Sequence, residues 1–437
     1  MPRLKAFEKY VQGLEDIAGE SLVSAILRSE LNQQITLALD GGSSATLRKV
    51  VSSKVRQRLG AFFTPTALAD QALDFFDQPI PKDALIMDCE CGAGDLLLAA
   101  ARRLPLSEDP ISTVKQWGEL LVGCDLQSEF VRATKVRLLL QAIALTDSEA
   151  DQTISILDDC LPNIKVLDAR KLVSEFERAS HIVINPSFAR EASPKQCVWA
   201  EDKVSAAAVI LDLCVTHAKP STQIVAILPD ILRSGSNYHR WRKHISSRAK
   251  IEKIKVIGKF DAWTDADVFL LKLRVRLKSR KDGTAIWWKQ RKGNRLKVGD
   301  LFEVEVGRVV PHRDPEDGPL NPYIFPKILP PWETIRSIDS ERRFTGKTFE
   351  PPFVAIRRTS RSNDQFRAVG TIIRGDKKVA VENHLIVLTP KDGLLRTCRQ
   401  LLDVLKLPKT NTWLNERIRA RHLTVPAINE IHWLPKT

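Results

Sequence analysis

The strongest constraint on this chain is a pattern that recurs four times in its first half. Each time, a short apolar run ends at an acid or an amide, and a stretch of helical character or a turn follows. The four runs and the polar residues that close them are 84–88 with Asp88, 120–125 with Asp125, 164–169 with Asp168, and 182–184 with Asn185. Strand-sized runs that alternate with helices predict an α/β fold with a parallel sheet. The carboxyl ends of parallel strands share one edge of the sheet, so we expect these side chains to line a common ligand site.

A glycine turn after the first run supports such a site. Cys91, Gly92 and Gly94 lie between the strand that ends at Asp88 and the helical run 95–101. Glycines let the backbone approach a ligand closely, and a helix N-terminus binds polar ligand groups. The turn lacks the third glycine of the dinucleotide fingerprint, so it indicates a nucleotide-type site of another kind. For any one of the acids alone a helix N-cap is the simpler explanation, and the repetition is what favours the site.

The fourth run breaks at Asn185-Pro186-Ser187-Phe188. Proline cannot continue a central strand, so an amide, a carbonyl and an aromatic ring are expected at the rim of the sheet. These groups suit a planar ring that carries an amine, because they offer acceptors for its N–H groups and a π-face for stacking. An ordinary strand-to-loop turn that ends in a core Phe is the alternative for the tetrapeptide alone.

Length, charge and cysteine content bound the class of protein. The chain has 437 residues, a net charge of +14 and a pI near 9.5. These values fit two domains and favour a polyanionic partner such as nucleic acid, with a basic surface that serves solubility as the alternative. Seven scattered cysteines favour a reducing compartment, and no Cys/His spacing predicts a metal site. Without a signal segment or an apolar run of membrane length, the sequence predicts a cytoplasmic protein that makes no membrane contact.

Composition divides the chain into a helical N-terminal segment (1–57), an α/β domain (58–296) and a proline-rich C-terminal domain (297–437). In the last of these, a basic and hydroxyl-rich stretch between two strand-like runs contains Arg357, Arg358 and Arg361. Side chains of this kind suit phosphates or base edges, so we expect them to bind DNA. A solvated loop is the alternative for any single Arg.

In this order, the pieces resemble the amino-methyltransferases of bacterial restriction–modification systems, in the adenine-modifying group whose cofactor motifs precede the catalytic motif. The resemblance covers most of residues 58–275 and implies a Rossmann-like methyltransferase domain, with a mostly parallel seven-stranded sheet and helices on both faces. It also implies a short helical N-terminal segment and a mixed α+β C-terminal target-recognition domain. The implied cofactor is S-adenosylmethionine, with contacts from Phe63, Thr64, Asp88, Cys91, Gly92, Gly94, Asp125, Asp168 and Asn185.

The resemblance also implies a role for the residues of the fourth run. Asn185, Pro186 and Phe188 match the catalytic motif, in which the Asn side-chain oxygen and the Pro carbonyl accept the two amine hydrogens. The aromatic ring then stacks on a base flipped out of the duplex. The implied function is site-specific methyl transfer from S-adenosylmethionine to the exocyclic amine of adenine in duplex DNA. Double-stranded DNA and a companion restriction or defence protein are the implied partners.

Ser187 departs from the family, whose motif has a second proline at this position. The proline ring stiffens the loop, so Ser187 indicates either a slower enzyme or a catalytically idle subunit that binds cofactor and DNA. If Ser187 only loosens a working loop, Ser187→Pro is expected to raise turnover or leave it similar. Methylation of RNA or of a protein glutamine is a further alternative, because the motif also serves planar amides. Adenine and cytosine amines stay undistinguished, whereas cytosine-ring methylation is disfavoured because the chain has no Pro-Cys pair.

Overall fold

A computed structural model describes residues 4–146, 148–149, 154–195, 197–280, 287–288 and 296–434. The chain forms two compact units, one made of residues 1–232 and 239–285, the other of residues 233–238 and 286–437. The domain boundaries drawn from the sequence after residues 57 and 296 stay predictions. Among the described residues, none of the helices combines the length and the apolar composition that a bilayer span requires.

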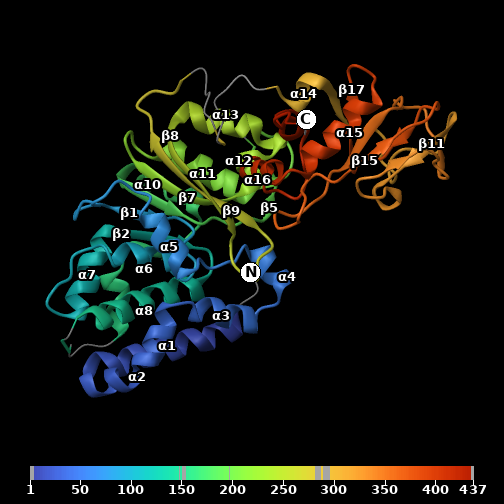
Figure 1. Ribbon diagram of the computed structural model, residues 1–437. Coiled ribbons are helices and arrows are strands. Elements are labelled where there is room, and N and C mark those ends of the chain that lie inside the picture. Colours follow the sequence, from blue (N-terminus) through green and yellow to red (C-terminus); the bar gives the residue numbers. More distant parts are fainter. Residues whose placement is uncertain are drawn as a thin grey trace. The chain divides into compact units, whose positions relative to one another are not determined.

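A seven-stranded sheet forms the centre of the first unit (Figure 1). Its strand order is β3 (Ile164–Val166), β2 (Leu121–Asp125), β1 (Ile86–Asp88), β4 (His181–Ile184), β7 (Gln223–Pro229), β9 (Asp267–Val275) and β8 (Ala249–Lys259). The first five strands in this order run parallel, whereas β9 is antiparallel to β7 and β8 is antiparallel to β9. The predicted α/β fold with a mostly parallel seven-stranded sheet is therefore confirmed.

Helices cover both faces of this sheet, as the sequence predicts (Figure 1). One face carries α5 (Thr66–Leu73), α6 (Asp95–Ala101), α7 (Pro110–Leu120) and α8 (Ser128–Leu145), and the other carries α10 (Val173–Arg178), α11 (Ala206–His217) and α13 (His239–Arg248). Shorter elements are α9 (Leu157–Cys160), α12 (Asp230–Ser234) and the hairpin of β5 (Arg190–Glu191) with β6 (Val204–Ser205). The direction of strand connection reverses between β1 and β4. In open α/β sheets such a reversal opens a crevice at the carboxyl ends of the two strands.

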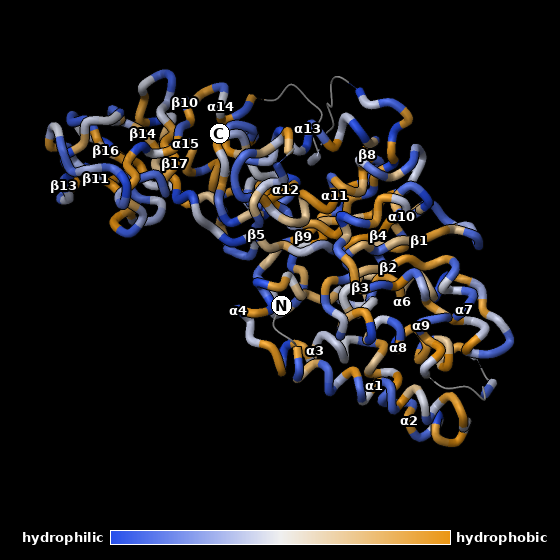
Figure 2. The backbone as a smooth tube through the Cα atoms, turned by 180° about the vertical axis from the view of Figure 1, so that it is seen from behind, coloured by the Kyte–Doolittle hydropathy of each residue, from blue (hydrophilic) through white to orange (hydrophobic). Residues whose placement is uncertain are grey.

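The central strands are apolar along their whole length because both of their faces are covered. Every residue of β4 and of β7 is buried. The hydropathy colouring of Figure 2 accordingly concentrates its hydrophobic end in the central strands and in α11. Parallel strands that are buried on both faces read as continuous apolar runs rather than alternating ones. This is why the runs stand out in the sequence.

The described residues before α5 form the helices α1 (Lys5–Val23), α2 (Ala25–Leu39), α3 (Gly42–Val50) and α4 (Ser53–Leu59). The buried residues of α1, which include Phe7, Val11, Leu14 and Ala18, recur every three or four positions and so lie on one helical face. Helix α1 packs along α8. The N-terminal helices are thus part of the core of the first unit.

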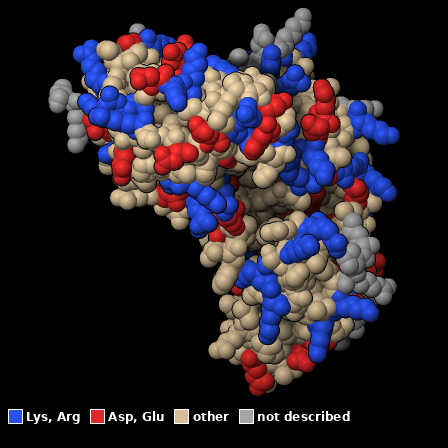
Figure 3. Space-filling model, turned by 90° about the vertical axis from the view of Figure 1, so that its right-hand side faces the viewer, with Lys and Arg blue, Asp and Glu red and all other residues tan. Residues whose placement is uncertain are grey.

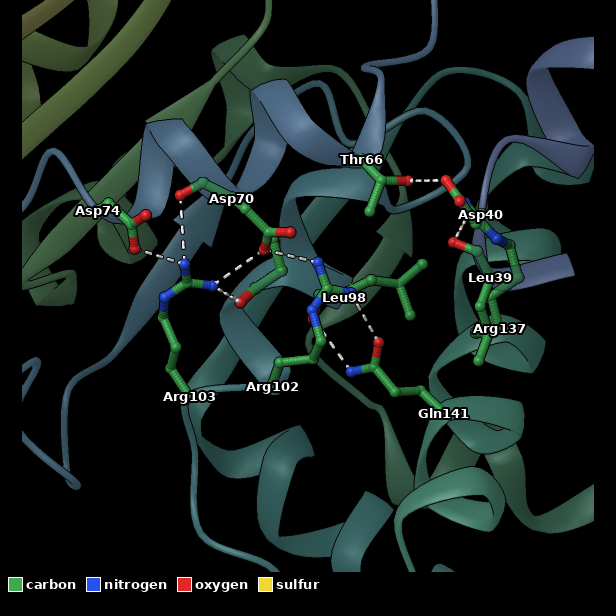
Figure 4. A network of polar contacts seen from close by, with 11 residues as sticks. Leu39, Asp40, Thr66, Asp70, Asp74, Leu98, Arg102, Arg103, Arg137 and Gln141 are labelled. Carbon is green, nitrogen blue, oxygen red and sulfur yellow. Dashed lines mark hydrogen bonds and ion pairs between the residues drawn. The ribbon is translucent and has the colours of Figure 1, made fainter. Parts of the chain in front are cut away.

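Polar contacts join these helices to the rest of the first unit, as Figure 4 shows for Arg137 with Leu39 and for Thr66 with Asp40. The Arg137 guanidinium on α8 is fully buried, and its Nε donates to the Ala38 carbonyl at 2.8 Å. Its Nη1 donates to the Ala93 carbonyl within the turn and to Asp95 Oδ1 at 2.9 Å. A buried charge requires such a set of partners, because an unpaired one is costly. One side chain therefore joins the end of α2 to the turn after β1.

The second unit is built on two small sheets. A five-stranded sheet has the order β10 (Phe302–Val306), β17 (Leu385–Pro390), β14 (Phe353–Arg357), β15 (Gly370–Ile373) and β12 (Thr334–Ile335), and a three-stranded sheet has the order β13 (Glu341–Arg343), β11 (Leu320–Ile324) and β16 (Ala380–Val381). Its helices are α14 (Val298–Leu301), α15 (Leu395–Lys406), α16 (Pro408–Arg417) and α17 (Val425–Asn429). The predicted mixed α+β character of the C-terminal part is confirmed.

Strand β14 shows how this unit is packed. Val354 and Ile356 belong to a core shared with α15 and α16, whereas Phe353 and Ala355 belong to a second core with β11 and β16. Successive strand residues point to opposite faces, so one central strand serves two hydrophobic layers.

Candidate active site

A cavity of about 290 Å³ lies at the carboxyl edge of the sheet in the first unit. Its walls come from the segments that follow β1, β2, β3 and β4, and from the segment between α4 and α5. Five residues predicted from the sequence line it: Phe63, Gly92, Asp125, Asp168 and Asn185. Its other walls include residues that the motifs did not single out: Arg58, Gly60, Glu90, Arg170 and Glu191.

Asn185 is held with its amide in a defined orientation. Its Nδ2 donates to the Phe62 carbonyl at 3.3 Å and to Thr64 Oγ1 at 2.9 Å. Because a carbonyl can only accept, the contact with Phe62 requires the NH₂ group on that side. Among the described residues no donor bonds to Asn185 Oδ1, so this oxygen is the acceptor that the residue offers. Thr64 itself is buried and does not line the cavity, so it acts on Asn185 from behind.

Asp125 ends β2 and faces the cavity. Its carboxylate accepts the N–H of Gly92 at 3.1 Å and the N–H of Gln127 at 2.8 Å. Burial nevertheless raises the pKa of Asp125 to about 6, because the two hydrogen bonds only partly offset the loss of hydration. Asp125 is therefore a carboxylate poised to accept hydroxyl groups or to pair with a cation.

The glycine turn needs its glycines for shape. Gly92 and Gly94 have φ angles of +53° and +88°, in the region that residues with a Cβ rarely adopt. A Cβ on Gly92 would come within 3.1 Å of the Phe63 ring, and one on Gly94 would come within 2.8 Å of Thr134. Cys91, which comes directly before Gly92, is buried beside the same threonine. Gly94 and Cys91 thus shape the turn without lining the cavity.

Asp88 lies beneath the site rather than in it. Only 1% of its surface is exposed, and its carboxylate accepts the Glu90 N–H at 3.3 Å. Burial raises the pKa of Asp88 well above its usual range. Asp88 therefore shapes the turn from below, and the cavity-facing acid of this turn is Glu90.

Glu90 is the residue that the motif analysis missed. It lines the cavity, and its Oε2 accepts the backbone N–H of Ser187 at 3.0 Å. Burial raises the pKa of Glu90 to about 7, with a smaller upward contribution from Asp125 and Glu191. The available signal in the sequence was a charged residue set between two buried cysteines in the turn after β1.

The opposite wall carries a short charge network. Asp168 caps the turn after β3 by accepting the Arg170 N–H at 2.9 Å. The Arg170 guanidinium then bridges Asp168 at 3.3 Å and Glu191 at 3.1 Å. Asp168 is thus both an N-cap and a cavity residue, so the two explanations weighed for it from the sequence coexist.

Pro186 and Phe188 lie apart from the cavity wall. Pro186 is buried, and the Phe188 ring packs edge-on against Phe260 with centroids 5.9 Å apart. Phe188 also packs against the main core of the unit. The stacking of Phe188 on a target base stays a prediction. Its partner Phe260 lies in the loop that connects β8 to β9, and no sequence motif indicated this residue.

Comparison with known proteins identifies this arrangement. Residues 46–259 match the model of the N-6 DNA Methylase family. Residues 46–259 therefore form a domain of the N-6 DNA methylase family. Members of this family are adenine-specific DNA methyltransferases of restriction–modification systems, so the resemblance drawn from the motifs is confirmed.

One solved structure shares the fold at low sequence identity, and others match with lower TM-scores. The type IIL restriction-modification enzyme MmeI in complex with DNA matches with a TM-score of 0.51 and 12% identity, over 89% of this chain and 70% of that chain. The type IIG restriction endonuclease BpuSI matches at 0.47 and 14%, over 94% and 63%. The M protein of the type I restriction enzyme EcoKI matches at 0.36 and 11%, over 62% and 58%. The chain spans less than two-thirds of the length of the latter two, and no curated protein matches it.

Two arginines in the basic stretch of the second unit donate hydrogen bonds to the backbone of their own unit. Arg357 Nη2 donates to the Leu329 carbonyl at 2.7 Å, and Arg358 Nη1 donates to the Asn383 carbonyl at 3.3 Å. Arg361 is exposed, and within the described residues its guanidinium donates to no protein acceptor. Of the three predicted DNA contacts, Arg361 is the one whose side chain is presented to solvent.

Positive and negative side chains are mixed on one face of the structure (Figure 3). On the face that Figure 3 shows, Lys and Arg side chains lie in several groups with Asp and Glu between them. Among the described residues no three His, Cys, Asp or Glu side chains are grouped as a metal site would require.

Proposed function

We propose that this protein transfers a methyl group from S-adenosylmethionine to the exocyclic amine of adenine at a specific site in duplex DNA. The observation that carries the proposal is the oriented amide of Asn185 at the rim of the cavity. Its two N–H donors are engaged by Phe62 and Thr64, which leaves Oδ1 as an acceptor. An acceptor fixed in this way suits an amine hydrogen of the target base.

The cavity fits S-adenosylmethionine by its donor set. The ligand presents hydroxyls, an amine and a sulfonium, and the cavity presents Glu90, Asp125 and Asp168. Burial holds the pKa of Glu90 and of Asp125 above their usual values, so a cation in the cavity would stabilise both carboxylates. Bound S-adenosylmethionine would supply an electrophilic methyl group.

Each residue around the cavity would have a defined part in binding S-adenosylmethionine. Asp125 would accept the ribose hydroxyls and Asp168 the adenine amine, while Phe63 and the backbone of Gly92 would cover the ligand. Thr64 would act through Asn185, and Asp88, Cys91 and Gly94 would act by holding the shape of the turn. Each assignment follows from the position of that residue relative to the cavity.

Methyl transfer would require the protein to orient the adenine amine more than to supply a reactive group of its own. An adenine amine is a weak nucleophile because its lone pair is delocalised into the ring. With one hydrogen bonded to Asn185 Oδ1 and the other to the Pro186 carbonyl, the nitrogen would become more tetrahedral and direct its lone pair at the methyl. The bound cofactor would supply the methyl group, and the amine would lose a proton to solvent. Phe188 would support the flipped base, and proximity supplies most of the acceleration.

The partners belong to the same proposal. The second unit would recognise the target sequence, with Arg361 on a phosphate or base edge. A companion restriction or defence protein would complete the system in the cell. All seven cysteines are free thiols, which suits the reducing cytoplasm.

Asn185→Ala tests the proposal. Loss of the acceptor is expected to lower methyl transfer from labelled S-adenosylmethionine to duplex DNA at least about 100-fold. Cofactor affinity, measured by calorimetry, should change by less than about threefold, because the other walls of the cavity are unaltered. Asn32→Ala, a change at an exposed position of α2, is the matched control and should leave both values as in the parent.

Two results would overturn the proposal. One is that Asn185→Ala methylates DNA as well as the parent, which would remove this residue from catalysis. The other is incorporation of label into bulk RNA or bulk protein, but not into duplex DNA. If the proposal holds, modified-base detection in DNA from cells that express the chain identifies both the methylated base and the recognition site.

A further inference from the structure

We propose that Glu90 is a positioning residue of the methyltransferase site: its carboxylate holds the Asn185–Phe188 loop through the backbone N–H of Ser187, where the motif of the family has a proline ring. The consequence for turnover depends on the proposed methyl transfer, whereas the coupling between the two residues does not.

The hydrogen bond exists only because residue 187 is not proline. Ser187 N donates to Glu90 Oε2 at 3.0 Å, and both residues line the cavity. Proline has no backbone N–H, so the motif of the family could not make this contact. Among the described residues, this N–H is the one donor that bonds to the Glu90 carboxylate. The departure at position 187 and the acid at position 90 are therefore two halves of one interaction.

Further contacts show that the loop is fixed without a second ring. The Ser187 hydroxyl accepts the Ala189 N–H at 3.2 Å, which closes a local turn. Gly60 lies directly against the same side chain, since a Cβ there would fall 1.9 Å from Ser187 Oγ. Asn185 is tied to the adjoining segment through Phe62 and Thr64. The carboxylate of Glu90 adds a hydrogen bond from the turn after β1, so the loop is also held by a residue of the proposed cofactor site.

The charges around Glu90 make this hydrogen bond responsive to what occupies the cavity. Asp125 and Glu191 face it with carboxylates and Arg170 with a guanidinium, and the buried carboxyl of Asp88 lies below it. Burial holds the pKa of Glu90 at about 7, so the carboxylate is only part ionised near neutrality. A cationic ligand would favour the ionised form, which accepts the Ser187 N–H more strongly. Glu90 would in this way couple cofactor binding to the position of the Pro186 carbonyl.

The structure leads to an expectation for Ser187→Pro opposite to the one drawn from the sequence. The substitution removes the N–H and leaves the Glu90 carboxylate without its donor, which is unfavourable in an enclosed site. Methyl transfer should fall about 10- to 100-fold, and the melting temperature by about 3–8 °C. Ser187→Ala keeps the N–H that Glu90 accepts and loses only the hydroxyl contact with Ala189, so it should retain more methyl transfer than Ser187→Pro.

A double-mutant cycle isolates the interaction. Without the carboxylate, proline at 187 should cause no further loss, because no donor is then required. Glu90→Ala/Ser187→Pro should therefore match Glu90→Ala within about threefold and exceed Ser187→Pro about tenfold in methyl transfer. The same non-additivity should appear in melting temperature and in S-adenosylmethionine affinity, neither of which requires DNA.

Glu90→Gln separates positioning from general stability. A Gln oxygen can still accept the Ser187 N–H, so Glu90→Gln should keep most of the turnover that Glu90→Ala loses. The parent is expected to gain turnover as the pH increases through about 7, and Glu90→Gln should remove this rise because residue 90 no longer ionises. A role that was only structural would not move this profile.

Three outcomes distinguish the positioning role of Glu90, its ionisation and the proposed activity. If the losses of Glu90→Ala and Ser187→Pro add in melting temperature and in cofactor affinity, Glu90 does not position residue 187. If Glu90→Gln keeps the parental pH profile, ionisation of Glu90 does not govern the loop. If the cycle shows the coupling while no variant methylates any duplex, the positioning role stands and the proposed activity fails.

Discussion

The two regions that the sequence marked for ligands use their polar residues in different ways. At the sheet edge of the first unit, Asp125, Asp168 and Asn185 come from different strand ends and face one cavity. In the basic stretch of the second unit, Arg357 and Arg358 donate to backbone carbonyls of their own unit instead. Only Arg361 of that stretch has an exposed side chain without a protein acceptor, among the residues described.

The difference follows from how each side chain is placed. A short Asp or Asn at the end of a parallel strand has its direction fixed by the hydrogen bonds of the sheet. A long Arg in a loop has many rotamers and reaches any nearby carbonyl, and Arg is often used in this way to satisfy a loop backbone. Motif positions at a sheet edge therefore predict a cavity better than basic composition in a loop predicts a nucleic-acid contact.

The largest effect should come from an arginine that the basic stretch does not include. Arg367 is buried and donates to Ser360 Oγ at 3.0 Å, to the Ile418 carbonyl at 2.9 Å and to the Ala420 carbonyl at 2.9 Å. Arg367→Ala leaves these acceptors without a donor and should destabilise the second unit by about 2–4 kcal/mol. Urea unfolding measures this, and Arg399→Ala, at an exposed position of α15, is the control. Equal stability of the two variants would contradict a structural role for Arg367.

Asp125→Asn should weaken S-adenosylmethionine binding about 10- to 100-fold, because the amide keeps the shape and removes the charge. Asp83→Asn, at an exposed position before β1, is the control. Burial sets the pKa of Asp125 at about 6 instead of 3.8, so the group is mostly protonated at about pH 5 and ionised at about pH 7.5. A cationic ligand prefers the ionised form, so affinity in the parent should rise with pH over this range.

The raised pKa of Asp125 also affects the stability of the ligand-free protein, which should fall with increasing pH where cofactor affinity rises. The contribution of Asp125 to the stability of the ligand-free protein is fully present below pH 3.8 and is lost as the pH rises through about 6. Melting temperatures measured from about pH 4 to 7 should therefore fall less in Asp125→Asn than in the parent. A parental cofactor affinity that stays flat with pH would show that this carboxylate does not meet the ligand.

The smallest effect should separate two arginines only four positions apart. Arg361→Ala should lower duplex DNA affinity about 3- to 10-fold and reduce the salt dependence of binding by about one phosphate contact. Arg357→Ala should leave the salt dependence unchanged and lower stability by about 1–2 kcal/mol, because it removes a hydrogen bond within the unit. Binding titrations at several salt concentrations distinguish the two, and the reverse assignment would break the comparison between the regions.

The sequence by itself determined the sheet and the edge at which the site lies. The apolar runs that end in Asp88, Asp125, Asp168 and Asn185 define the strands and the positions where they end. Parallel strands that are covered on both faces are continuously apolar, and their carboxyl ends lie at a common edge. The glycine turn was readable for the same local reason, since Gly92 and Gly94 adopt backbone angles that favour glycine. These features depend on neighbours in the chain.

Only the tertiary structure decided which of those residues face the cavity and what holds them. Glu90 meets the N–H of a residue 97 positions away, and Arg137 joins α2 to the glycine turn. Asp88 is instead enclosed beneath the turn, and Phe188 packs on Phe260. Contacts of this kind follow from where loops meet after the sheet has formed. No periodicity or spacing encodes them, because a hydrogen bond between distant segments depends on distance and direction in space.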